Sequence, residues 1–221
     1  MLSFQKNLGV KFKNINVLNT ALIHKSFAHE RGTSVNNERL EFLGDAVLDV
    51  VTATLLYKNL ADRNEGQMTK IKATAVSEET LADKAREMQI DGVLLMGKGE
   101  EQTGGRKKNA ILADALEALI AALYLDSGYK SVFKFVSDFM EKEIVRVMSN
   151  SRDYKSSLQE ICQHRFKTYP IYHLIKYSGP EHERYFFVEV TVNGESFGPA
   201  VGKNKKAAEQ EAAKMALSAL S

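Results

Sequence analysis

One segment of the chain reads as a helix that is apolar on every side except for two carboxylates. It runs from Leu112 to Leu125, and its only charged residues are Asp114 and Glu117, three positions apart. Residues at this spacing share a helical face, so the two side chains would repel each other. Taking a carboxylate out of water also costs several kcal/mol unless the charge is compensated. The segment therefore predicts a core helix and a bound cation.

A second segment, Glu38 to Val51, repeats this arrangement with Glu41 and Asp45 four positions apart among apolar residues. Acids at helical spacing most often form a solvated face, so neither pair is diagnostic alone. The apolar surroundings favour a metal site, and we expect all four carboxylates to leave water and converge on one point. Gly44 would allow a facing helix to approach closely, although glycine within a helix costs about 1 kcal/mol.

The composition is that of an ordinary globular protein. The chain has 221 residues, of which 44% are hydrophobic and 26% are charged, so it can hold one large domain or two smaller ones. No apolar run approaches the length of about 18 residues that a membrane span needs, and the first residues lack a signal-peptide pattern. We expect a cytosolic protein without a membrane partner. The single Cys162 excludes an internal disulfide and a thiolate zinc cluster, and we interpret it as a small buried apolar residue.

The pattern of the chain changes near residue 149. Residues 1–148 carry apolar positions at helical spacing almost throughout and contain 20 Lys and Arg against 20 Asp and Glu. The glycine-rich basic segment Gly97 to Asn109 interrupts this pattern and predicts a loop, well placed to meet phosphate. A polar linker is expected at residues 149–153. Residues 149–221 contain 10 basic residues against 8 acidic ones, so the basic excess lies in this last third.

The last third predicts a helix, three strands and a final helix. Tyr185 to Val192 alternates apolar residues with others, which indicates a strand with one buried face. Asn193 and Gly194 then form a favoured hairpin turn. Pro199 cannot donate to a sheet ladder, so the third strand should lie at an edge. The other expected elements are the helix Tyr154 to Phe166, the strand Ile171 to Lys176, the strand Glu195 to Val201 and the helix Lys205 to Leu220.

These residues together resemble a bacterial ribonuclease III over nearly the whole chain. The matching runs are NERLEFLGDAVL, ILADALEALIAALYLDSG, DYKSSLQEICQ and GKNKKAAEQEAA. The resemblance implies an all-α endonuclease domain at residues 1–148, which forms a homodimer, followed by a small α+β domain of order α-β-β-β-α at residues 154–221 that binds double-stranded RNA. Ile23, Asn204 and Pro199 depart from the usual family pattern, and none of them belongs to the acidic set.

The resemblance also assigns roles to the four acids. Glu41, Asp114 and Glu117 would be metal ligands, with Glu117 also catalytic beside Asp45, which would orient a metal-bound water. Two divalent ions could activate the water and hold the leaving group, and four carboxylates balance their charge. Oxygen ligands suit Mg²⁺, or Mn²⁺ in its place, better than zinc.

The implied reaction is hydrolysis of double-stranded RNA to staggered ends with 5′-phosphate and 3′-hydroxyl groups, with ribosomal and other RNA precursors as substrates. Duplex RNA is contacted across about 16 base pairs through its shape, 2′-hydroxyls and phosphates. We expect contacts at the first helix of the second domain, at the loop between its first two strands, and at the basic start of its last helix. These residues are Gln159, Glu160, Gln163, His182, Lys203, Lys205 and Lys206.

Two other readings compete with this one. A protein that binds double-stranded RNA or ribosomes without cleaving would be expected to have lost a metal carboxylate, and all four are present. A helical phosphohydrolase acting on nucleotides would need a histidine-aspartate pair, and no histidine here precedes an aspartate. Among the remaining candidates, Glu38 and Glu65 are interpreted as surface groups, although Glu65 resembles a family residue near the RNA, and His24 is interpreted as a structural histidine. Phe42 is by default a core residue, whereas in the resembled family this position contributes to the dimer contact.

Overall fold

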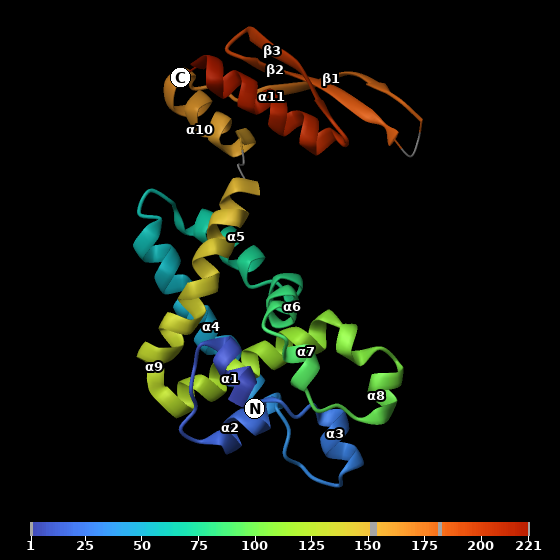
Figure 1. The fold of residues 1–221 in the computed structure, drawn as a ribbon. Helices are drawn as coiled ribbons and strands as arrows, with labels where there is room; N and C mark the ends of the chain where they lie inside the picture. The colour runs from blue at the N-terminus through green and yellow to red at the C-terminus, as the bar shows by residue number, and fades with distance from the viewer. Residues whose placement is uncertain (1, 151–153, 181–182, 221) are drawn as a thin grey trace. The chain divides into compact units, whose positions relative to one another are not determined.

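The computed structural model describes residues 2–150, 154–180 and 183–220, and the chain divides into two units, Met1–Asn150 and Ser151–Ser221 (Figure 1). Each unit is described by itself. The first is helical throughout, as expected. Its elements are α1 (Leu2–Leu8), α2 (Ile15–Ala21), α3 (Lys25–Glu30), α4 (Glu38–Asn59), α5 (Glu65–Ala75), α6 (Glu78–Glu87), α7 (Ile90–Val93), α8 (Lys98–Gln102), the 3₁₀ helix η1 (Gly105–Lys107) and α9 (Asn109–Asn150).

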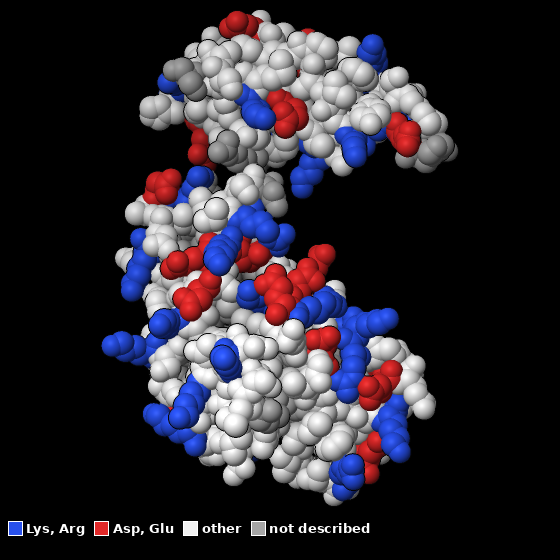
Figure 2. Space-filling view, viewed as in Figure 1, with Lys and Arg blue, Asp and Glu red and all other residues white. Residues whose placement is uncertain are grey.

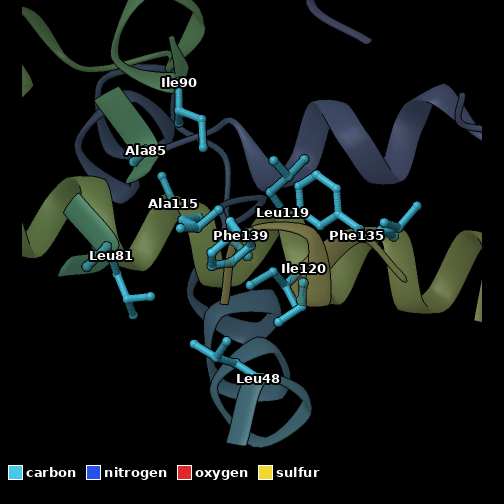
Figure 3. Close-up of a cluster of buried hydrophobic side chains, with 14 of the residues drawn as sticks. Leu48, Leu81, Ala85, Ile90, Ala115, Leu119, Ile120, Phe135 and Phe139 are labelled. Atoms are coloured by element: carbon cyan, nitrogen blue, oxygen red, sulfur yellow. The ribbon is translucent and has the colours of Figure 1, made fainter. Parts of the chain in front are cut away.

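The first half of α9 is the central element of the first unit. Helix α9 as a whole contacts α2, α4, α5 and α6. Nearly all residues between Leu112 and Leu123 are buried, which explains why this part of the sequence is apolar on almost every side. Figure 3 shows Leu119 and Ile120 of α9 in the core, with Leu48 of α4 and Leu81 of α6 among the other buried side chains. At Gly128 the backbone adopts a positive φ of 76°, and the second half of α9 continues in a new direction.

Two expectations about this unit are wrong. The segment Gly97 to Asn109 is not a plain loop, because it contains α8 and η1. Its basic residues are interleaved with acidic ones, and Arg106 Nε donates to the carboxylate of Glu101 at 2.6 Å. The predicted linker also begins too early, since Ser149 lies within α9 and its hydroxyl donates to the carbonyl of Arg146 at 2.8 Å.

The second unit packs two helices on one face of an antiparallel sheet. The strands follow the order β1 (Ile171–Ser178), β2 (Tyr185–Val192) and β3 (Glu195–Gly202), and the helices are α10 (Tyr154–Phe166) and α11 (Lys205–Leu220). The alternating side chains of β2 bury Val188, Val190 and Val192 against the helices, as the period of two predicts. Cys162 is fully buried in the same core, as expected.

The turn and the edge strand of this sheet follow from three residues. Asn193 and Gly194 both have positive φ, 48° and 87°, which is the requirement of the two-residue turn that joins β2 to β3. β3 is an edge strand, and its register with β2 shifts at the position of Pro199, so the missing N–H of proline falls at an irregularity. Within the described ranges, no helix has the length and hydropathy that crossing a membrane requires.

Candidate metal centre and nucleic-acid interface

The acidic centre forms where α4 crosses the first half of α9. Glu41 and Asp45 lie one turn apart on α4, and Asp114 and Glu117 share a face of α9. Gly44 lies at the point of closest approach, where a Cβ atom would overlap the backbone carbonyl of Glu117. The expectation that Gly44 admits a close helix neighbour is therefore confirmed.

Three of the four predicted carboxylates come together. One oxygen from each of Glu41, Asp114 and Glu117 lies within 4.8 Å of the other two, and all three side chains are half-buried. Asp45 is exposed and lies outside this set. The prediction that all four leave water is wrong for Asp45, because α4 packs on α9 through the buried Gly44 and the next residue, Asp45, stays exposed. In the described ranges, no other group of three or more acids, histidines or cysteines has this spacing.

The electrostatics show that these charges lack compensation. Burial raises the pKa of Glu117 to about 7, and the charges of Asp45, Asp114 and Glu41 add to the effect. Burial also raises the pKa of Glu41, with Asp114 as the next cause. The pKa of Asp114 is raised by burial as well, against the opposing charge of Lys25. A cation at this point would remove the repulsion that all three groups share.

The other acids near the centre have protein partners. Glu38 pairs with Lys25 of α3 at 3.1 Å, and Asp49 pairs with Lys72 of α5 at 2.8 Å. Glu65 is exposed and accepts a hydrogen bond from a neighbouring threonine. Glu38 and Glu65 are thus surface groups, as interpreted. Sequence reasoning missed Lys25, because a single lysine on a short helix has no periodic signal.

His24 has a structural role, as expected. Its Nδ1 accepts the backbone N–H of Ser26 at the start of α3, and the backbone N–H of His24 donates to the carbonyl of Leu95 at 2.9 Å. Burial lowers the pKa of its imidazole. Figure 2 shows Lys and Arg interleaved with Asp and Glu on the face drawn. Lys108 is itself paired, with Glu100 at 2.6 Å.

The predicted RNA contacts of the second unit lie at its surface. Gln159, Glu160 and Gln163 of α10 are exposed, and the amide of Gln163 donates to the hydroxyl of Tyr169 at 2.8 Å. His182 lies outside the described residues.

The basic start of α11 presents Lys203, Lys205 and Lys206 to solvent. Asn204, a departure from the family pattern, caps this helix by accepting the N–H of Ala207 at 2.8 Å. Exposed amides at a helix start favour phosphate, and the lysines add to that attraction. Lys206 and Gln159 line one open cleft of about 580 Å³ between α10 and α11, so the structure brings two of the predicted contacts together.

Comparison with known families decides the identity of this arrangement. Residues 14–144 match the family described as ribonuclease-III-like, and residues 154–220 match the double-stranded RNA binding motif. The chain belongs to the ribonuclease III family. Relatives named Ribonuclease 3 include that of Treponema denticola, 52% identical over 98% of this chain and 89% of its own length, and that of Clostridium perfringens, 40% identical over 100% and 94%.

Solved structures agree with this membership of the ribonuclease III family. The nuclease domain of ribonuclease III from Campylobacter jejuni is 41% identical, covers 63% of this chain and 95% of its own, and superposes with a TM-score of 0.60. The expected fold class is confirmed, with a helical nuclease unit before a double-stranded RNA binding motif. The expectation that the chain is an endonuclease is confirmed as well.

Proposed function

We propose that this chain hydrolyses phosphodiester bonds of double-stranded RNA with a divalent metal, held by Glu41, Asp114 and Glu117. The observation that carries the proposal is the convergence of these three half-buried carboxylates within 4.8 Å in a member of the ribonuclease III family. Their oxygens are hard ligands, which favours Mg²⁺, with Mn²⁺ as a substitute. The raised pKa values support this fit, since each group gains from a nearby cation.

Each acid has a part in this proposal. A divalent ion held there supplies Lewis-acid stabilisation of charge on the phosphate and activates water for attack. Glu117 has a pKa raised to about 7, and the family resemblance would place it beside the reacting phosphate. Asp45 is exposed and free of this packing, so its carboxylate can accept a hydrogen bond from the attacking water and orient it. We expect staggered products with 5′-phosphate and 3′-hydroxyl ends.

The substrate would be held by the second unit. The exposed polar residues of α10 and the three lysines at the start of α11 supply separate contacts to 2′-hydroxyls and phosphates. His182 is proposed as a third contact on the strength of the family resemblance. The same resemblance suggests precursors of ribosomal RNA among the substrates. In this proposal residues 1–148 cut the RNA and residues 154–221 bind it.

We further propose that the first unit forms a homodimer through α4. Phe42, Val50 and Tyr57 recur at helical spacing on this helix, and their side chains are 82%, 55% and 78% exposed. Phe42 is therefore not the core residue that a default interpretation suggests. The nuclease domain of ribonuclease III from Campylobacter jejuni has a region involved in dimer formation, which supports a dimer of this unit, while the exposed apolar residues of α4 support the choice of helix. Phe42→Glu should convert the dimer to a monomer in sedimentation velocity runs.

The decisive experiment incubates the full chain with a perfect RNA duplex in Mg²⁺ and in EDTA. We expect metal-dependent cuts at staggered positions, mapped on both strands by end-labelling. Glu41→Gln should remove cleavage, whereas Glu141→Gln makes the same chemical change at an exposed acid in the second half of α9, outside the centre, and should cleave normally. Duplex binding without cleavage in Mg²⁺ would favour the rival, a non-catalytic RNA-binding protein, and cleavage that persists in EDTA would exclude a metal mechanism.

A further inference from the structure

Acids follow one stripe along α4, and the two ends of the stripe differ from its middle. Glu38, Glu41, Asp45 and Asp49 recur at intervals of three or four residues. The end members each pair with a lysine from another helix, at 3.1 Å for Glu38 and 2.8 Å for Asp49. In the described part of the chain, neither Glu41 nor Asp45 takes part in an ion pair. The stripe therefore has a cation at each border of the acidic centre.

The backbone fixes the position of Lys25, the cation at the first border. Lys25 is the first residue of α3, directly after the capping residue His24. The buried Asn37 donates its N–H to the carbonyl of Ile23 at 2.9 Å, and Glu38 follows Asn37 at the start of α4. This bond joins the start of α3 to the start of α4.

The side chains continue this connection. Glu38 accepts from Lys25 with one carboxylate oxygen, and its other oxygen accepts from the amide of Asn36 at 3.3 Å. The carboxylate is thus oriented from both sides. The side chain of Lys25 is still 64% exposed, so its ammonium can reach a ligand without leaving Glu38.

The charge of Lys25 acts on the acidic centre. It opposes the rise that burial causes in the pKa of Asp114 and in the pKa of Glu41. RNA must bring a phosphate to this point, where three carboxylates repel it. A fixed and exposed cation at the border provides attraction at the place where the repulsion is strongest.

We propose that Lys25 contacts a backbone phosphate of the RNA strand that enters the acidic centre, with Glu38 holding its ammonium in position. The proposal rests on the nuclease function proposed above and adds a substrate-positioning residue to it. A structural ion pair is the competing explanation. The two explanations predict different changes in metal binding when Lys25 is replaced. Under the proposal RNA binding weakens and divalent-ion binding becomes tighter, because the same positive charge attracts phosphate and repels a metal ion. Under the structural explanation both interactions weaken.

The test compares full-length Lys25→Met with wild type in two binding measurements. Duplex RNA binding is titrated in EDTA at several NaCl concentrations, where we expect affinity about fivefold lower and a salt slope shallower by about one per subunit. Mn²⁺ binding is titrated calorimetrically without RNA, where we expect a dissociation constant about threefold lower, since a nearby repulsion is removed. Lys25→Arg should retain wild-type values in both measurements.

Two further variants make the result decisive. Lys142→Met removes an equal charge from an exposed position on α9 and should leave both measurements unchanged. The double variant Lys25→Met with Glu38→Gln removes both charges of the ion pair, so the Glu38 carboxylate is not left without its lysine partner. Under the structural alternative it restores the wild-type salt slope, whereas under the proposal the slope stays shallow.

In the RNA titrations, either of two results would overturn the proposal: an unchanged salt slope in Lys25→Met, or recovery of the wild-type slope in the double variant. Weaker Mn²⁺ binding in Lys25→Met would also contradict it, because a structural loss weakens both interactions. Failure of the proposed metal-dependent nuclease function would show separately in wild type: cleavage in EDTA would exclude the metal mechanism, and no cleavage in Mg²⁺ would exclude the nuclease.

Discussion

The acidic centre and the basic start of α11 hold their charges in opposite ways. Glu41, Asp114 and Glu117 are half-buried, and packing of α4 on α9 keeps these like charges within 4.8 Å of one another. The lysines at the start of α11 are exposed and are presented by one helix end alone. The first site therefore depends on tertiary packing and on proton or metal occupancy. The second depends on local structure and on salt.

The largest expected effect separates chemistry from binding. Glu117→Gln keeps the shape of the side chain but removes one metal ligand, so we expect single-turnover cleavage to fall by a factor on the order of 10³. Duplex affinity should change less than about twofold, since the phosphate contacts of the second unit remain. Gel shifts and single-turnover assays on the same preparation measure both. Wild-type cleavage in this variant would contradict the assignment of Glu117.

The reverse separation comes from the basic start of α11. Replacing Lys203, Lys205 and Lys206 together with alanine should weaken duplex binding by about 30-fold and flatten its salt slope by about two to three units. Cleavage at saturating RNA should remain near wild type, because the acidic centre is intact.

The matched control for the triple lysine variant changes three exposed lysines of α9. Alanine at Lys130, Lys134 and Lys142 alters the net charge equally. If this control flattens the salt slope as much as the triple variant, general charge attraction rather than a localised contact explains binding.

The sequence predicts the acidic centre well where a local pattern carries the signal. Two acids in an apolar helix indicate burial, and Gly44 indicates a close helix crossing. The exposure of Asp45 could not be predicted, because helical spacing defines a face but not where the neighbouring helix stops covering it. Lys25 was missed for a related reason, since its position depends on a backbone bond between segments that share no pattern.

The second unit was predicted more completely because its determinants are local. Alternation identifies β2, the Asn193-Gly194 pair identifies the turn, and Pro199 identifies the edge strand. The prediction of a plain loop from Gly97 to Asn109 was wrong, because glycine content does not reveal short helices that ion pairs such as Arg106 with Glu101 stabilise. Glycine content indicates that the backbone can adopt many conformations, but contacts between side chains decide which conformation the segment adopts.

Packing at the helix crossing can be tested directly. Gly44→Ala places a methyl group against the Glu117 carbonyl, so α4 and α9 must separate. We expect the free energy of unfolding to fall by about 3 kcal/mol, together with weaker metal binding. Urea unfolding followed by circular dichroism measures the change. Gly66→Ala on α5 is a suitable control, because a Cβ there makes only an ordinary contact at 3.6 Å. Helix propensity alone would stabilise both variants, because alanine favours the helix more than glycine does. Equal losses in both variants would therefore mean that the close approach at Gly44 is not responsible.

The smallest expected effect is a pH dependence confined to the acidic centre. Burial raises the pKa of Glu117 from 4.5 to about 7, so the metal-free folded chain retains a proton that the unfolded chain has already lost in this range. Stability without metal should therefore fall as the pH rises from 4.5 to about 7 and level off above it. Metal competes with the same proton, so Mn²⁺ affinity should rise by up to about tenfold per pH unit below the pKa and then become constant. Glu117→Gln should remove this rise from calorimetric titrations, while Glu141→Gln, at an exposed acid outside the centre, should keep it. An affinity that stays flat between pH 5 and about 7 in the wild type would show that Glu117 is already ionised there, and that the like charges of the centre are compensated without a metal.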